Sequence, residues 1–219
     1  MLIGCWSPKG GSGTSVVAAA LALGGSPSLL IDGAGELDAV LGITADGPGV
    51  RGWLSSAAIP PPDALGRLEV PVADGVGLVP SGPAIGARPA PGRASLLADL
   101  LRGDDRVVVV DVGAADDEAA GELLLAADLR LCVLRPCYLA ARRLQASSTP
   151  VDGLVLVDEP GRSLRADDLA GAAGVPVVGR VPWDPAIARA VDAGVLATRQ
   201  PRVLMRAARR LLELDGARR

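Results

Sequence analysis

Short apolar runs rich in β-branched residues alternate along the whole chain with segments in which alanine and leucine recur about every 3.6 residues. The apolar runs predict strands at residues 2–6, 28–32, 77–80, 106–112, 129–134, 151–157 and 175–181. The periodic segments predict helices at residues 15–23, 94–101, 118–126, 139–146, 165–172 and 202–214. Several strands are apolar throughout, as in a sheet covered on both faces. The alternation predicts a doubly wound α/β fold with a mainly parallel sheet flanked by helices.

The pattern shows no break between domains, so the 219 residues predict a single domain over 1–219. Residues 44–73 have the poorest periodicity and contain three consecutive prolines, Pro60 to Pro62. They predict a surface excursion with at most short helices. Residues 201–214 predict a C-terminal amphipathic helix, whose apolar face we expect to pack on the domain.

Composition removes several classes of function. The chain has no histidine, which excludes Ser-His-Asp hydrolysis and histidine metal sites. Four aromatic residues are too few for a surface that stacks on single-stranded nucleic acid. The three cysteines have no CxxC spacing and predict reduced thiols. No apolar stretch reaches the ~20 residues of a membrane span, so we expect a cytoplasmic protein.

A glycine loop between the first predicted strand and helix carries the clearest chemistry. The loop reads Ser-Pro-Lys-Gly-Gly-Ser-Gly-Thr-Ser over residues 7–15. Glycines let backbone N–H groups converge on an anion, and the N-terminus of the following helix adds positive charge. We expect the phosphates of a nucleotide to bind here. The expected contacts are Lys9, Gly10, Gly11, Ser12, Gly13, Thr14 and Ser15.

Lysine placement sets this loop apart from an ordinary P-loop. The pattern G-x-x-x-x-G-K-[ST] places Thr14 where the phosphate-binding lysine belongs, and Ser15 where a hydroxyl ligates Mg²⁺. The basic residues comprise 21 arginines and one lysine, Lys9, which stands five residues before Thr14. A lysine at that place resembles the deviant loop K-G-G-x-G-K-[ST] of the ParA/MinD ATPases. The resemblance implies ATP or ADP with Mg²⁺ as cofactors, and a homodimer in which Lys9 reaches the partner's nucleotide.

A run of four valines leads into Asp111 and then Gly113. Such a strand delivers its acid to the carboxyl edge of a parallel sheet, beside the first loop. Within the resemblance it corresponds to the Walker B strand and switch II. We expect Asp111 and Ser15 to hold Mg²⁺, and the Gly113 N–H to face the γ-phosphate.

The second predicted strand ends at Asp32, and residues 35–42 resemble the family's switch I. The family usually has a second acid two residues later, which orients the attacking water, and here that place is Ala34. Asp32 is therefore either a remnant catalytic acid, acting with Lys9 and Asp111, or the polar end of a strand. Without the carboxylate at 34 and the charge at 14, we expect weak ATP hydrolysis or none.

Later segments resemble the base-binding side of the family. Asp158 ends a strand where relatives often carry asparagine for the purine, and the segment from Pro182 to Pro185 matches their adenine-side loop. We therefore expect Asp158, Pro182 and Asp184 to contact the base. A carboxylate accepts hydrogen bonds but does not donate them, so adenine and guanine are not distinguished. A solvated loop acid is the alternative interpretation of Asp158.

Within the family, the loop and the short chain look most like the actinobacterial CpaE/TadZ branch. That resemblance implies a homodimeric positioning protein or scaffold for Tad pilus or secretion machinery, at the cell pole or the inner face of the membrane. An active ParA/MinD ATPase that positions chromosomes, plasmids or septa is one alternative. A nucleotide-free interaction module is another.

The C-terminal helix raises two further partners. Its arginines could contact DNA phosphates, but net charge −3 and a pI of about 5.0 argue against nucleic acid. Peripheral membrane contact through residues 201–214 has few bulky apolar side chains to support it.

Overall fold

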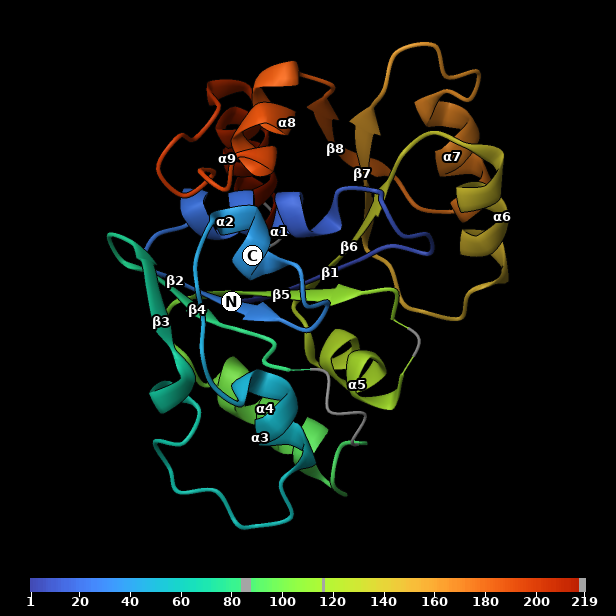
Figure 1. Cartoon of the computed structure of the whole chain (residues 1–219). Coiled ribbons are helices and arrows are strands. Elements are labelled where there is room, and N and C mark those ends of the chain that lie inside the picture. The colour runs from blue at the N-terminus through green and yellow to red at the C-terminus, as the bar shows by residue number, and fades with distance from the viewer. Residues whose placement is uncertain (84–87, 116, 217–219) are drawn as a thin grey trace.

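The computed structural model describes residues 1–83, 88–115 and 117–216. Within them, one eight-stranded sheet has the strand order β3-β4-β2-β5-β1-β6-β7-β8 (Figure 1). The strands are β1 (Leu2–Trp6), β2 (Ser28–Asp32), β3 (Val70–Ala73), β4 (Val76–Val79), β5 (Val107–Gly113), β6 (Leu129–Leu134), β7 (Gly153–Asp158) and β8 (Val177–Pro182). Neighbouring strands are parallel except β3 and β4. The predicted doubly wound, mainly parallel α/β fold is confirmed.

Helices cover both faces of the sheet (Figure 1). One face carries α1 (Thr14–Gly24), α2 (Leu37–Leu41), α8 (Pro185–Asp192) and α9 (Arg202–Gly216). The other carries α3 (Gly49–Ser55), α4 (Arg93–Arg102), α5 (Glu118–Ala126), α6 (Tyr138–Ala146) and α7 (Ala166–Ala173), and a 3₁₀ turn, η1, spans Gly66–Leu68. Two apolar cores result, one on each side of the sheet.

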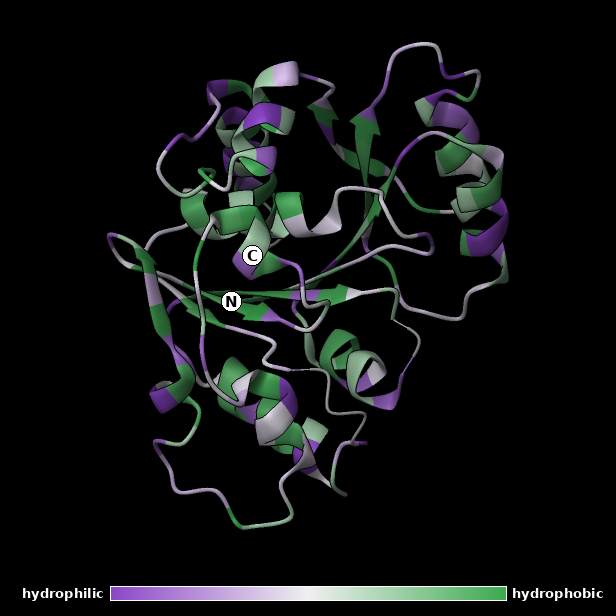
Figure 2. Ribbon diagram, viewed as in Figure 1, coloured by the Kyte–Doolittle hydropathy of each residue, from purple (hydrophilic) through white to green (hydrophobic). Residues whose placement is uncertain are grey.

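Strand β5 explains why both cores form. Val108 and Val110 pack into the core under α3 to α7, whereas Val109 packs into the core under α1 and α9. Successive side chains of a strand point to opposite faces, so a strand covered on both sides is apolar throughout. Figure 2 shows the strands as largely hydrophobic and the helices around them as mixtures of hydrophobic and hydrophilic residues.

The strands and helices predicted from the pattern lie within two residues of observed elements. The pattern missed β3, α2, α3, η1 and α8. Strand β3 lies at the edge of the sheet and pairs only with β4, so its side chains are half-buried or exposed and give no apolar run. The 44–73 segment contains α3, η1 and β3.

The C-terminal helix α9 packs on α1 and β8. Leu204, Ala208 and Leu211 of its apolar face are buried, and Gly179 of β8 leaves the space that Leu211 fills. The apolar face of α9 that these three residues form is therefore covered by the domain, as expected from the pattern. Across the described ranges, no helix combines the length and the apolar character needed to cross a bilayer.

Helix α3 begins with a backbone contact to the end of β4. Gly49 has φ +57°, and a Cβ there would lie 2.5 Å from the carbonyl oxygen of Pro80. The next two N–H groups of α3 donate to the carbonyls of Pro80 and Ser81, at 2.8 and 3.1 Å. This close approach fixes the start of α3 at the carboxyl edge of the sheet.

We expect Gly49→Ala to lower the free energy of unfolding by roughly 3 kcal/mol or more, because it adds a backbone clash to the cost of a positive φ. Gly92→Ala is the matched control: Gly92 also has positive φ, +73°, but a Cβ there meets no atom within 4 Å. That variant should lose only about 1 kcal/mol. Urea denaturation measures the free energy of unfolding of both variants. Equal losses in the two would contradict the close contact between Gly49 and Pro80.

Candidate functional site

The carboxyl ends of β1, β2 and β5 meet at one edge of the sheet and hold the glycine loop. The Ser7 N–H donates to the Gly113 carbonyl at 2.9 Å, and the Gly33 N–H donates to the Asp111 carbonyl at 2.9 Å. The loops that follow β1 and β2 are therefore both tied to β5. In a doubly wound sheet, this edge is where ligands bind.

The glycine loop is organised from inside by hydroxyl groups. The buried Ser7 and Ser12 hydroxyls are 2.8 Å apart, and both donate to the Lys9 carbonyl, at 2.9 and 2.8 Å. Gly11 and Gly13 have φ +75° and +91°, which only glycine adopts without strain, and Gly13 leads directly into α1. This arrangement leaves the outer side of the loop open: a Cβ at Gly10 or Gly11 would meet no atom within 4 Å.

A cleft of about 650 Å³ lies over this loop. Besides the loop, it is lined by the segments after β2 and β5 and by three cationic side chains, Lys9, Arg51 and Arg135. Its anionic lining residues are Glu36 and Asp117. The structure brings the predicted phosphate contacts Lys9 to Ser15 together with Gly113 in this one cleft.

Asp111 is fully buried beneath the cleft. Its Oδ1 accepts from the Gly113 N–H at 3.2 Å, and its Oδ2 has no hydrogen-bond partner among the described residues. Loss of water raises the pKa of Asp111 to about 6; the Ser15 hydroxyl opposes this rise, and the charge of Asp32 adds to it. The Gly113 N–H, expected at the γ-phosphate, is thus directed at Asp111.

Asp32 lies beside Asp111 on the adjacent strand and is also buried. Its carboxylate accepts from the N–H groups of Gly35, Glu36 and Leu37, at 2.6, 3.3 and 3.2 Å. Burial raises the pKa of Asp32, and these three donors oppose the rise. Asp32 therefore shapes the loop that leads into α2, which favours the structural interpretation of this acid. Ala34 lines the cleft in that same loop.

Lys9 and Thr14 lie on the cleft wall as the loop pattern predicts. The Lys9 side chain is half-buried and makes no hydrogen bond or ion pair with any residue that the structure describes. Thr14 is the buried first residue of α1. Position 14 thus offers a hydroxyl group and no charge.

An apolar hollow of about 230 Å³ adjoins the cleft, and the two share Gly13, Val16, Arg135 and Val191 as lining residues. Pro182, Trp183 and Asp184 form its outer side, as predicted for a base-binding loop. The Arg135 guanidinium lies 4.8 Å from the centre of the Trp183 ring. Asp184 accepts from the Ala186 N–H at 2.7 Å and caps helix α8.

Asp158 is not among the residues that line this hollow, and its contact with the base stays a prediction. Arg180, on the neighbouring strand β8, donates two hydrogen bonds to its carboxylate, at 2.7 and 2.9 Å. The residue lines a separate depression with Pro160 and Arg162. Asp158, the last residue of β7, thus forms an ion pair with Arg180 of β8.

Sequence reasoning missed two residues of the cleft. Arg51 comes from α3, and its Nη2 donates to the Ala34 carbonyl at 3.1 Å and to the Gly33 carbonyl at 3.4 Å. Glu36, just before α2, lines the cleft and raises the pKa of Asp111 through its charge. Neither residue lies in the glycine loop motif. The only sequence signal for Glu36 is its position in the loop that follows the second strand.

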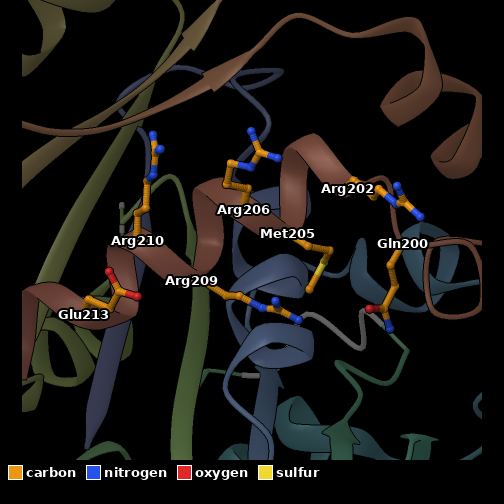
Figure 3. A pocket seen from close by; sticks show the side chains of 7 residues that line it. All are labelled: Gln200, Arg202, Met205, Arg206, Arg209, Arg210 and Glu213. Carbon is orange, nitrogen blue, oxygen red and sulfur yellow. The ribbon is translucent and has the colours of Figure 1, made fainter.

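A second hollow, of about 600 Å³, follows the outer face of α9. Figure 3 shows Arg206 and Arg210 extending from the same side of the helix, with Met205 on another side. The residues that line this hollow are Gln200, Arg202, Met205, Arg206, Arg209, Arg210 and Glu213. It is remote in sequence from the glycine loop and shares no lining residue with the cleft.

Several solved structures resemble this chain over almost its whole length. A ParA family ATPase from Chlorobium tepidum superposes with a TM-score of 0.81 at 22% identity, covering 97% of this chain and 98% of that one. The septum site-determining protein MinD from Pyrococcus horikoshii, solved with Mg-ADP, gives 0.79 at 21% identity, covering 100% and 98%. The chain has the ParA/MinD fold.

Curated relatives are more similar in sequence. Uncharacterised proteins from two strains of Mycobacterium tuberculosis are 31% identical to this chain over 222 aligned residues. The alignment covers 93% of this chain and 61% of each relative, so the chain spans about three-fifths of their length. No model of a known protein family matches the chain.

The buried Asp111 carboxylate predicts a pH effect on stability. Because folding raises its pKa from 3.8 to about 6, the folded chain loses stability as pH rises through that range. We expect Asp111→Asn to remove this loss and to raise the free energy of unfolding at pH 8 by roughly 2–3 kcal/mol. The two proteins should differ little at pH 4.

Urea denaturation at both pH values, with a chelator present, measures this difference. Asp63→Asn is the control, because Asp63 is an exposed acid paired with Arg67. If the free energy of unfolding of the wild type does not fall between pH 4 and pH 8 relative to that of Asp111→Asn, the raised pKa of Asp111 is refuted.

Proposed function

We propose that this protein is a nucleotide-binding positioning protein that takes up Mg-ATP and Mg-ADP and forms a homodimer across its nucleotide face. One observation carries the proposal: an open glycine loop at a helix N-terminus continues, through shared lining residues, into an apolar hollow. The cleft offers backbone amides and cations for phosphates, and the hollow offers an apolar surface for a base.

The residues beside the loop fit Mg²⁺. Asp111 Oδ2 is a buried acceptor without a hydrogen bond from any described residue, and the Ser15 hydroxyl is its neighbour. Mg²⁺ is commonly held by one or two protein oxygens together with phosphate oxygens. When bound with nucleotide, the ion neutralises phosphate charge.

Hydrolysis in this proposal is slow. Phosphoryl transfer depends on positioned charge around the phosphates and on an oriented water. Thr14 supplies no charge, and Ala34 supplies no carboxylate. The protein therefore acts as a switch between nucleotide states more than as a rapid enzyme.

The finer role extends the proposal to CpaE/TadZ-type positioning of Tad pilus or secretion machinery in the cytoplasm. The lysine-poor loop sequence supports this role. The relatives' greater length leaves room for partner-binding segments beyond the region that aligns with this chain.

The proposal predicts that Mg-ATP binds and doubles the mass of the protein, and that Lys9→Ala binds nucleotide but stays monomeric. The reason is that the Lys9 ammonium has no partner among the described residues of its own chain and is available to a second copy. Calorimetric titration with ATP and ADP, run in parallel with light scattering, measures both properties.

Arg102→Ala, on the far helix α4, is the control and should dimerise as the wild type does. A Lys9→Ala protein that dimerises normally with ATP would exclude the cross-dimer role. No binding at millimolar nucleotide would refute the proposal and select the nucleotide-free interaction module.

The position of Glu36 in the cleft favours a second candidate function, an active positioning ATPase. Its carboxylate lines the cleft beside Ala34 and could orient water in place of the missing acid. If so, phosphate release from Mg-ATP is readily measurable, and Glu36→Gln lowers it at least about tenfold. Glu69→Gln, which removes a carboxylate remote from the cleft, is the control. Phosphate release that is absent or insensitive to Glu36→Gln would exclude this candidate.

A further inference from the structure

The cleft lacks a cation at its helix end. Thr14 occupies the position from which a P-loop lysine reaches the β- and γ-phosphates. Lys9 is directed to a partner in the proposed dimer, and Arg135 lies at the hollow end, beside Trp183. A single chain therefore needs another charge to hold a terminal phosphate.

Arg51 belongs to α3, which packs on the opposite face of the sheet from α1 and α8, the helices that line the hollow. It lines the cleft but not the hollow, and it contacts the loop at Gly33 and Ala34. A nucleotide whose base occupies the hollow would place its terminal phosphate farthest from Trp183. Ala34 in turn approaches Gly113, where a Cβ would lie 3.2 Å from that of Ala34. Arg51 is thus beside the two loops that follow β2 and β5.

The backbone holds Arg51 in this place. Its own N–H donates to the Ser81 carbonyl at 3.1 Å, and Gly49 and Gly82 let α3 and the end of β4 approach without side chains between them. Among the residues that the structure describes, its guanidinium donates only to the carbonyls of Gly33 and Ala34, and both hydrogen bonds come from Nη2. Nε and Nη1 remain available to an anion.

We propose that Arg51 recognises the terminal phosphate of the bound nucleotide, supplying from α3 the positive charge that Thr14 does not supply from α1. This inference rests on the proposed nucleotide-binding function. A guanidinium offers five N–H donors in a planar fork that matches phosphate oxygens, and such charge-assisted hydrogen bonds are stronger than those to neutral carbonyls. ATP would therefore engage Arg51, whereas ADP, lacking the terminal phosphate, would not.

The test compares the dissociation constants of Mg-ADP and the slowly hydrolysed analogue Mg-ATPγS by calorimetry. Arg51→Ala and Arg51→Gln should weaken Mg-ATPγS about tenfold or more and Mg-ADP less than about threefold. Arg51→Gln removes the charge and keeps an amide donor on a shorter side chain, whereas Arg51→Lys keeps the charge, so the two variants together separate charge from hydrogen bonding. Arg51→Lys should recover part of the loss. Arg67→Ala, an exposed ion-paired arginine of the same segment, is the matched control and should bind both ligands as the wild type does.

Equal weakening of both ligands, or none, in Arg51→Gln would overturn the proposal, since either result leaves Arg51 with a structural role only. If Arg51→Ala does not fold, as judged by circular dichroism, Arg51→Gln and Arg51→Lys decide the question. The two proposals fail differently. A wild-type chain that binds neither ligand refutes nucleotide binding and this inference with it, whereas a wild type that binds Mg-ATPγS with unchanged variants refutes Arg51 alone.

Discussion

Burial of two carboxylates side by side, Asp32 and Asp111, is the constraint on which the site depends. Asp32 ends β2, Asp111 lies near the end of the adjacent parallel strand β5, and both are almost completely removed from water. A buried charge is costly unless it is hydrogen-bonded or paired. Asp32 meets this requirement with three loop amides. Asp111 meets it only in part, so the free oxygen at the floor of the cleft favours a cation.

The loops around the cleft follow from how these acids are accommodated. Three backbone N–H groups donate to the Asp32 carboxylate and hold the segment after β2 against the end of the strand. This places Ala34 and Glu36 on the cleft wall. The strand β5 that carries Asp111 also accepts the first hydrogen bond of the glycine loop, through Gly113. One strand pair therefore fixes the floor and two walls of the site. The apolar cores on both faces hold that pair rigidly, since β2 and β5 are central in the sheet.

Most of the fold and the glycine loop could be predicted from sequence because their signals are local. Four valines before Asp111 and the glycines of the loop define strand and anion site within a few residues. Arg51 could not be predicted this way. Its place depends on a contact between Gly49 and Pro80, which are 31 positions apart, in a segment without periodicity. Asp158 ends a strand where relatives often carry asparagine for the purine. Its ion pair with Arg180 on the adjacent strand could not be predicted, because strand neighbours do not follow from one strand's sequence.

The helix that supplies the positive charge for a phosphate affects how such a protein responds to its ligand. A lysine on α1 would be carried by a long helix packed between the sheet and α9, and binding phosphate would leave the surrounding loops unchanged. Arg51 instead already donates to the Gly33 and Ala34 carbonyls. In the proposed site, a phosphate bound by Nε or Nη1 while Nη2 keeps these carbonyls would be joined through one side chain to the loop beside Glu36 and Gly113. A charge on α3 in place of α1 would, under the proposed function, couple phosphate recognition to the loop that forms the cleft wall, as suits a switch more than a rapid enzyme.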